Sequence, residues 1–131
     1  MDAGAEYLAT EVLAPLREGK SVHTHRWDWH EDLFLAGDQV QPAGLIVVEG
    51  CGAISQASRP LLDAAVWLEA VESIRHTRAI TRDGDETWWR GWRDQEDAFY
   101  ARERSQQLAD FTLGPDVGVD ELLSLLREAR G

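Results

Sequence analysis

One apolar run, at residues 44–49, constrains the fold of this chain more than any other part of its sequence. Residues 45–48 are Leu-Ile-Val-Val, and Glu49 closes the run just before the glycines of residues 50–52. A strand with one solvated face alternates apolar and polar residues, whereas a strand covered on both faces stays apolar throughout. The run therefore predicts an interior parallel strand that delivers Glu49 to the carboxyl edge of a sheet, where open α/β sheets build their sites. A buried structural strand whose carboxylate only caps a loop is the alternative.

The remaining pattern predicts one α/β domain in which strands and helices alternate. The 131 residues and the hydrophobic content of 44% suit a single packed domain. The expected elements are a helix over residues 5–17, an extended segment over 21–30, a loop over 31–43, the strand over 44–49, a helical turn over 58–62, a strand over 64–69, a helix over 70–82, a long helix over 87–108, a strand over 109–113 and a helix from residue 120. This alternation is typical of a parallel sheet with flanking helices.

The composition narrows the classes of partner and compartment. Thirteen basic and 24 acidic residues leave a formal net charge of −11, which disfavours nucleic acid and anionic membranes as partners. Cys51 is the only cysteine, so no internal disulfide can form and a reducing cytoplasm is the expected location. The sequence holds no apolar stretch of about 20 residues that would span a bilayer, and its first residues do not read as an export signal.

Three arginines fall along one face of the helix expected over residues 70–82. Arg75, Arg78 and Arg82 are three and four residues apart, which places them on one helical stripe, called here the arginine stripe. Three guanidiniums in a row repel one another unless anions answer them, and each planar fork suits a pair of phosphate oxygens. The stripe is therefore a candidate phosphate site. A solvated helix face paired with neighbouring acidic residues is the alternative.

A second candidate site lies in the extended segment. Trp27, Asp28, Trp29 and His30 combine two indoles with a carboxylate and an imidazole. Such a set can stack on a base and hydrogen-bond to its edge or to a sugar hydroxyl, although tryptophans more often pack in a core.

Two weaker candidates are a metal site and a reactive thiol. His23, His25 and His30 lie close in sequence, and histidines on one strand face can share an ion, but no second cluster of matched spacing accompanies them. Cys51 follows the apolar run directly, yet no base partner is evident in the sequence, which argues against a nucleophilic thiol.

Short motifs follow one another between residues 5 and 114 in a characteristic order. They are Trp-Asp-Trp at 27–29, Leu-Ile-Val-Val-Glu-Gly at 45–50, Arg-Pro-Leu-Leu-Asp at 59–63, Val-Trp-Leu-Glu at 66–69, the arginine stripe, Glu-Asp-Ala-Phe-Tyr at 96–100 and Leu-Ala-Asp at 108–110. With this order the chain resembles the later part of a uridine-kinase-like P-loop nucleoside/nucleotide kinase. The resemblance implies an ATP-dependent phosphotransferase that uses Mg²⁺ and acts on a nucleoside-type small molecule.

The sequence departs from that family at its front. Those kinases begin with a strand and a glycine-rich loop ending in Lys-Ser or Lys-Thr, which cradles the nucleotide phosphates. No Gly-Lys-Ser or Gly-Lys-Thr occurs here, and Lys20 is the only lysine. The first two strands of the family are missing, and its strand order is 2-3-1-4-5. The resemblance thus implies an incomplete P-loop NTPase sheet with a gap between the strands at 44–49 and 64–69.

The resemblance also assigns roles to residues. Glu49 would stand near the magnesium ion and its waters, and the arginine stripe would belong to a lid that steadies the transferred phosphoryl group. Trp27, Asp28 and His30 would contact the base or ribose of the acceptor.

These expectations together describe a single partial domain. The chain would be the C-terminal part of a kinase-like phosphotransferase, inactive as it stands because its phosphate-binding loop is absent. A preceding segment or a separate chain would supply the missing front, and a dimer is a further possibility. The alternative is a non-catalytic nucleotide- or partner-binding module derived from a kinase.

Overall fold

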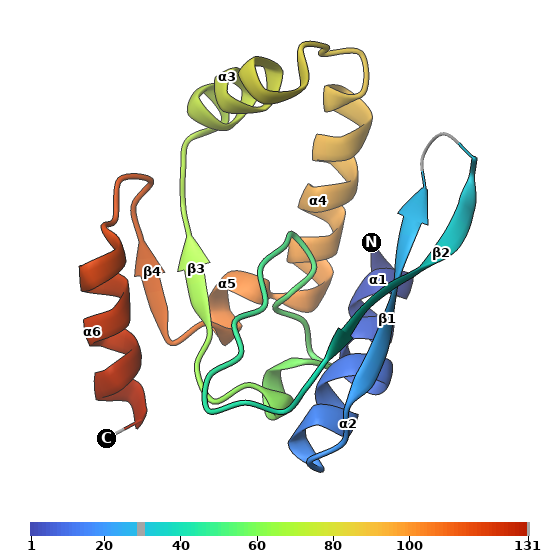
Figure 1. Ribbon diagram of the computed structural model, residues 1–131. Helices are drawn as coiled ribbons and strands as arrows, with labels where there is room; N and C mark the ends of the chain where they lie inside the picture. Colours follow the sequence, from blue (N-terminus) through green and yellow to red (C-terminus); the bar gives the residue numbers. More distant parts are fainter. Residues whose placement is uncertain (29–30, 131) are drawn as a thin grey trace.

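The computed structural model describes residues 1–28 and 31–130, and its elements form two groups that follow one another in sequence (Figure 1). The first group comprises α1 (Asp2–Tyr7), the π-helical segment Leu8–Leu13, α2 (Ala14–Arg17), β1 (Val22–Asp28) and β2 (Leu33–Val40). The second comprises the 3-10 turn Arg59–Leu61, β3 (Val66–Leu68), α3 (Glu72–Asp83), α4 (Trp89–Glu103), α5 (Ser105–Leu108), β4 (Phe111–Leu113) and α6 (Val119–Arg130). No described helix is long and apolar enough to cross a membrane.

The N-terminal helix is confirmed, and it packs on the hairpin. Helical backbone runs from Asp2 to Arg17 through the π-helical segment, and Pro15 does not interrupt it. Its buried positions recur at helical spacing, which makes one apolar face. Those positions are Ala5, Ala9, Leu13 and Leu16, and Val22 of β1 is buried with them. The backbone N–H of His25 donates to the hydroxyl of Tyr7 at 3.1 Å, which ties α1 to β1.

The predicted loop over residues 31–43 is wrong, because most of it forms β2. This strand pairs antiparallel with β1 from Val22 opposite Val40 to Asp28 opposite Leu33. The sequence misled because Gly37 was taken as a loop breaker. Instead, Gly37 lies where the register shifts, and a Cβ there would be 3.0 Å from the carbonyl oxygen of Thr24. Glycine marks a close approach of two strands at this position.

The second group confirms most of its predicted elements. β3 and β4 pair in parallel, with Val66 opposite Phe111 and Leu68 opposite Leu113. The helices expected over 70–82 and from residue 120 are present as α3 and α6, and the turn over 58–62 is present as well. The long helix over 87–108 is interrupted, since Arg104 adopts the left-handed conformation (φ 56°) and separates α4 from α5.

The predicted interior strand over residues 44–49 is wrong for this structure. No regular strand forms there, and no described strand pairs with the segment. Its side chains are also uncovered, with 59% of Leu45 and 72% of Val47 exposed. A parallel strand needs hydrogen-bonded neighbours and covered faces, and the segment finds neither among the described residues. Glu49 therefore lies on an exposed connecting segment.

The molecule exposes far more surface than its mass predicts. Its accessible area is 9246 Å², whereas a folded monomer of this mass is expected to expose about 6,900 Å², so the observed area is larger by about a third. Several large apolar side chains contribute to the excess, namely Phe34, Leu45, Val47, Leu68, Val71 and Val119. The fold therefore leaves apolar surface that no described element covers.

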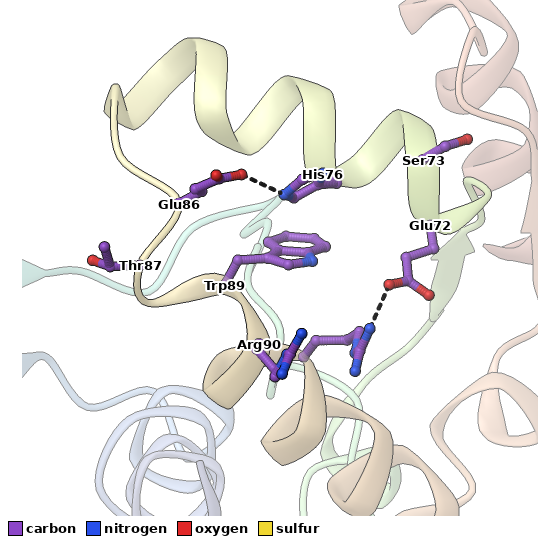
Figure 2. Close-up of a pocket in the computed structure, with 8 residues that line it drawn as sticks. Glu72, Ser73, His76, Glu86, Thr87, Trp89 and Arg90 are labelled. Atoms are coloured by element: carbon purple, nitrogen blue, oxygen red, sulfur yellow. Dashed lines mark hydrogen bonds and ion pairs between the residues drawn. The ribbon is translucent and has the colours of Figure 1, made fainter.

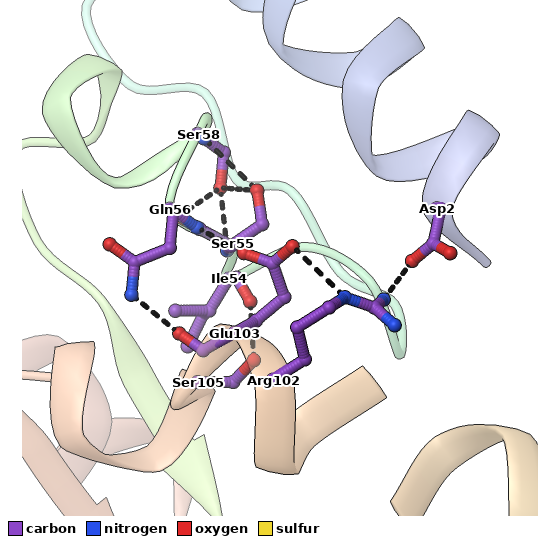
Figure 3. A network of polar contacts seen from close by, with 8 residues as sticks. All are labelled: Asp2, Ile54, Ser55, Gln56, Ser58, Arg102, Glu103 and Ser105. Atoms are coloured by element: carbon purple, nitrogen blue, oxygen red, sulfur yellow. Dashed lines mark hydrogen bonds and ion pairs between the residues drawn. The ribbon is translucent and has the colours of Figure 1, made fainter. Parts of the chain in front are cut away.

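A knot of buried serines anchors the segment that follows the exposed run (Figure 3). Ser58 Oγ donates to the carbonyl oxygen of Ala53 at 2.7 Å and accepts from the backbone N–H of Ser55 at 2.9 Å. Ser105 Oγ donates to the carbonyl oxygen of Ile54 at 2.7 Å, so the start of α5 holds the same loop. All three serines are buried. Residues 53–58 are thus fixed to the second group, while residues 44–49 are not paired.

Candidate functional site

The α3–α4 hairpin forms the walls of the candidate site. α3 ends at Gly84, which adopts the left-handed conformation (φ 72°) that favours glycine. The carboxylate of Asp85 then accepts from the backbone N–H and the hydroxyl of Thr87, both at 2.9 Å. The predicted long helix therefore begins two residues later than residue 87, because the Thr87 hydroxyl donates to Asp85 and α4 begins at Trp89. After this short turn α4 runs away from α3 in a different direction, so the two helices meet near the turn (Figure 1).

A cavity of about 900 Å³ lies between the two helices and the loop after Glu49. Indole rings and charged groups share its wall, and two members of the arginine stripe are among them. The lining residues are Cys51, Arg75, Ala79, Arg82, Asp83, Trp88, Trp89, Gly91, Trp92, Gln95 and Glu96. A mixed wall of rings and guanidiniums suits a ligand that has both a planar and an anionic part.

Glu96 is the buried carboxylate of this wall. Only 8% of the residue is exposed, and Arg75 Nη1 donates to Glu96 Oε1 at 3.2 Å. The Tyr100 hydroxyl donates to Glu96 Oε2 at 3.4 Å. Burial, followed by the charge of Glu96, raises the pKa of Tyr100 well above its ordinary range. Tyr100 therefore stays protonated and acts as a hydrogen-bond donor.

Cys51 is an unreactive thiol in this environment. Burial raises the pKa of Cys51 to about 11, and the charge of Glu96 and its hydrogen bond to the thiol add to the effect. Since the thiolate is the nucleophile, the raised pKa lowers the reactivity of Cys51 near neutral pH, although the residue is exposed at the surface. This geometry agrees with the argument against a nucleophilic cysteine.

The three arginines of the stripe point to three different partners. Arg75 binds Glu96, and Arg78 Nη2 donates to Asp116 at 3.4 Å on the loop before α6. Arg82 makes a bidentate contact with Asp83, at 2.7 and 2.8 Å. The structure thus brings Arg75 and Arg82 to one cavity and turns Arg78 towards Asp116.

Glu49 lies near the same cavity without lining it. The pKa of Arg82 is raised mainly by its hydrogen bond to Asp83, and the charge of Glu49 adds to that effect. The pKa of Cys51 is raised mainly by burial, and the charge of Glu49 adds to it as well. The structure therefore places Glu49 within electrostatic reach of one of the sequence-predicted arginines, Arg82, although the strand that was expected to deliver it is absent.

Two of the residues predicted to contact a nucleoside, Trp27 and Asp28, lie at the end of β1, and Figure 1 shows the β1–β2 pair on the other side of α4 from β3 and β4. Trp27 is opposite Phe34 in the β1–β2 ladder, and Asp28 Oδ1 accepts from the backbone N–H of Glu31 at 3.0 Å. His30 and Trp29 lie outside the described residues. A substrate role for Trp27, Asp28 and His30 remains a prediction.

The histidine metal site gains no support from the described residues. His25 is engaged by Tyr7, whose hydroxyl is 3.2 Å from Nδ1. No group of three potential ligands occurs in the described part of the chain.

A second cavity, of about 920 Å³, opens on the other side of the hairpin (Figure 2). His76 packs against the ring of Trp89, with centroids 5.0 Å apart, and its Nε2 is 3.5 Å from Glu86. Arg93 Nη1 donates to Glu72 at 2.7 Å. Arg93 and His76 of this wall pair with carboxylates, as Arg75 and Arg82 do in the first cavity, whereas Arg90 has no ion pair among the described residues.

Sequence reasoning missed Glu96, Tyr100 and the three tryptophans as parts of one site. Glu96 and Tyr100 are four residues apart, which puts them on one helical face. That face also carries Trp92, and a polar residue within an otherwise apolar stripe is the signal that marks a buried polar contact. The partner of Glu96 is on another helix, however, and spacing along one helix does not identify it.

Comparison with known proteins gives these elements a class and then a family. The model described as Phosphoribulokinase / Uridine kinase family matches residues 5–110, which makes the α/β chain a kinase-like phosphotransferase by class. The chain belongs to the phosphoribulokinase/uridine kinase family, as its sequence motifs predicted. No curated protein matches the chain significantly.

Kinases of this family generally use ATP and Mg²⁺, and the described residues fit that pair only in part. Magnesium sites in kinases combine carboxylates with nucleotide phosphates, and a loop of backbone amides holds those phosphates. Glu49 offers one exposed carboxylate, and the part of the chain that the structure describes holds no cluster of three potential ligands. The residues present do not form a complete ATP and magnesium site.

Proposed function

We propose that this chain is the C-terminal part of an ATP-dependent nucleoside or nucleotide kinase-like phosphotransferase and does not turn over ATP as it stands. The observation that carries the proposal is a pair of unsatisfied strand segments. Residues 44–49 pair with no described strand, and β3 pairs only with β4. One additional parallel strand between the two would satisfy both, because an interior strand bonds on each side.

The exposed side chains support the same arrangement. Leu45 and Val47 on one segment and Leu68 at the end of β3 are exposed, although such residues are typical of interior strands. An incomplete P-loop sheet that lacks its central strand explains why these particular side chains are uncovered. A front segment carrying that strand would also bring the phosphate-binding loop.

The roles proposed for the site follow from this arrangement. Glu49 would approach the metal from the carboxyl end of its strand, and the arginine stripe would face the transferred phosphoryl group. Trp27, Asp28 and His30 would contact the acceptor. In the described geometry Glu49 and Arg82 are already neighbours, which supports their assignment to one site.

The genomic sequence upstream of Met1 tests the proposal directly. An in-frame strand followed by a glycine-rich loop ending in Gly-Lys-Ser or Gly-Lys-Thr is expected. Stop codons immediately upstream would contradict it, and so would robust ATP turnover by the 131-residue chain.

Activity of the extended protein provides the second test. With ATP, Mg²⁺ and a panel of nucleosides and nucleotides, phosphoryl transfer is expected, and Arg82→Gln should lower kcat by about 10²-fold or more, as removal of one charge-stabilising donor does. Arg17→Gln is the matched control, because Arg17 pairs with Asp63 far from the cavity. Equal activity of the two variants would remove Arg82 from the site.

A second candidate is a non-catalytic nucleotide-binding module. The cavity with Arg75 and Arg82 is formed within this chain, and that observation favours binding without turnover. Isothermal titration of ATP and of inorganic tripolyphosphate into the 131-residue chain separates the candidates. Binding without hydrolysis supports the module, whereas a chain that binds neither and lacks near-UV circular dichroism contradicts it.

A further inference from the structure

Glu96 lies where three elements meet around the first cavity. It belongs to α4, it receives a hydrogen bond from Arg75 of α3, and its charge acts on Cys51 in the loop after residue 49. Tyr100, one turn further along α4, donates to its other oxygen. Among the described residues it is the one charged side chain that is buried.

The Arg75–Glu96 pair differs from the other two pairs of the arginine stripe. The guanidiniums of Arg78 and Arg82 are more exposed than that of Arg75, with 59% and 73% of their side chains exposed against 35%, and exposed ion pairs contribute little. Arg82 meets its sequence neighbour Asp83 through two hydrogen bonds, yet its side chain stays at the surface. In the Arg75 pair the carboxylate side chain is only 11% exposed. A carboxylate left alone in such a place is strongly disfavoured, so the two groups hold each other.

The Nε–H donor of Arg75 also indicates that this arginine is held in place. Its Nε is buried and has no hydrogen-bond partner among the described residues. A guanidinium that was free to move would turn until water reached this donor, because an unsatisfied buried donor is costly. Other contacts must therefore hold Arg75 in its observed position. The contact that holds it is the one to Glu96.

We propose that Glu96 is a positioning residue that fixes Arg75 against α4 and so divides the arginine stripe into one held guanidinium and two exchangeable ones. The inference rests on the proposed function, because it says how the stripe receives phosphate. An anion exchanges with the exposed partners of Arg78 and Arg82, whereas Arg75 stays on Glu96 and keeps α3 in register with α4.

Proton–nitrogen NMR of the arginine Nε–H groups tests the positioning itself. In the wild-type chain the Arg75 signal is expected to be resolved and to exchange with water at least tenfold more slowly than those of Arg78 and Arg82. In Glu96→Gln it should move to the averaged position of exposed arginines. Asp63→Asn is the matched control, since it removes the carboxylate partner of Arg17, which does not line the cavity, and should leave Arg75 unchanged.

The wild-type spectrum alone can overturn the proposal. If Arg75 exchanges as fast as Arg78 and Arg82, Glu96 does not hold it, whether or not the Glu96 variant folds. The same conclusion follows if Arg75 keeps its slow exchange in a folded Glu96→Gln protein.

Cys51 supplies a second readout. The groups that face its thiol are Glu96 and Tyr100 of α4, Glu49 of its own segment and Arg82 of α3. Its alkylation by iodoacetamide should follow a midpoint near pH 11 in the wild type. Glu96→Gln should lower that midpoint by about one unit and raise the rate at pH 8.5 about three- to fourfold, because more thiolate outweighs its lower nucleophilicity. An unchanged pH profile in a folded Glu96→Gln protein would contradict the contact between Glu96 and Cys51.

Titration with inorganic tripolyphosphate links the inference to the proposed function. Arg82→Gln should weaken binding at least fivefold, and Arg75→Gln less than twofold. An equal loss in both variants would overturn the division of the stripe. If no variant and no wild-type chain binds tripolyphosphate, the phosphate site of the proposed function is wrong, while the NMR result still decides whether Glu96 positions Arg75.

Discussion

Single side chains in this molecule hold together segments that are far apart in sequence. Arg59 is the clearest case, since its guanidinium donates to the carbonyl oxygens of Leu108 and Leu62 and to the carboxylate of Asp110, at 2.8, 3.0 and 2.9 Å. Asp110 in turn accepts from the backbone N–H of Ala65 at 2.8 Å. One arginine therefore fixes the entry to both strands of the parallel pair.

Replacing Arg59 by lysine should destabilise the chain despite the conserved charge. A single ammonium cannot serve three acceptors that lie in the fork geometry of a guanidinium, so partly buried acceptors lose their donors, at a cost of about 1–3 kcal/mol. The urea midpoint of Arg59→Lys should fall accordingly. Arg17→Lys is the control, because the Arg17–Asp63 pair is exposed, and its free energy of unfolding should stay within about 0.5 kcal/mol of the wild type. A midpoint for Arg59→Lys equal to that of the control would contradict this role.

The site residues were predictable from sequence only where spacing along one helix is enough. Arg75 and Arg82 were found because residues three and four apart share a helical face. Glu96 was not, since its partner comes from a different helix. The direction of Arg78, towards Asp116, likewise depends on how α6 is connected.

At the scale of elements, patterns that carry their own period were predicted correctly. Helix α3 and the N-terminal helix show apolar residues at helical spacing, and β1 alternates, so each is visible in isolation. β2 was missed because Gly37 breaks its pattern, although glycine there serves a close contact with β1. The segment 44–49 has the composition of a strand but pairs with no described strand, since a strand exists only with a neighbour.

The α3–α4 hairpin allows a matched pair of glycine substitutions. Gly84 has φ +72° with open space around it, and Gly91 lies inside α4, also with open space. Gly84→Ala should destabilise the chain by about 1 kcal/mol, because a Cβ is strained in the left-handed region. Gly91→Ala should stabilise it by about 0.5–1 kcal/mol through helix propensity. Thermal unfolding of both variants checks the prediction, and equal signs would show that the turn at Gly84 is not required.

At the scale of the whole molecule, the excess of accessible surface is the dominant feature. The area of 9246 Å² exceeds the expectation for the mass by about a third. Monomers seldom leave so much apolar surface uncovered, and large uncovered patches mark places where other polypeptide binds. Part of the exposed apolar surface coincides with the unpaired segment along residues 45–47.

Hydrogen exchange should map this openness directly. Amides of residues 45–49 should exchange at close to unprotected rates, whereas those of α4 around Phe99, which is 1% exposed, should be protected. The same chain should bind the dye ANS, and Val47→Lys should reduce that binding without lowering the urea midpoint, because Val47 is exposed. Slow exchange at residues 45–49 would mean that the segment is already paired in solution.

The serine knot has a consequence for assembly. Residues 41–52 are held at one end by the pairing of β2 and at the other by the hydrogen bonds of Ser55 and Ser58. Between these two fixed points the backbone is not fully extended. A strand that binds here needs only to extend residues 44–49 into a strand, while the β1–β2 pair and the helices keep their structure. Joining the two halves should therefore be limited by their encounter and scale with concentration, with no slow phase of unfolding before it.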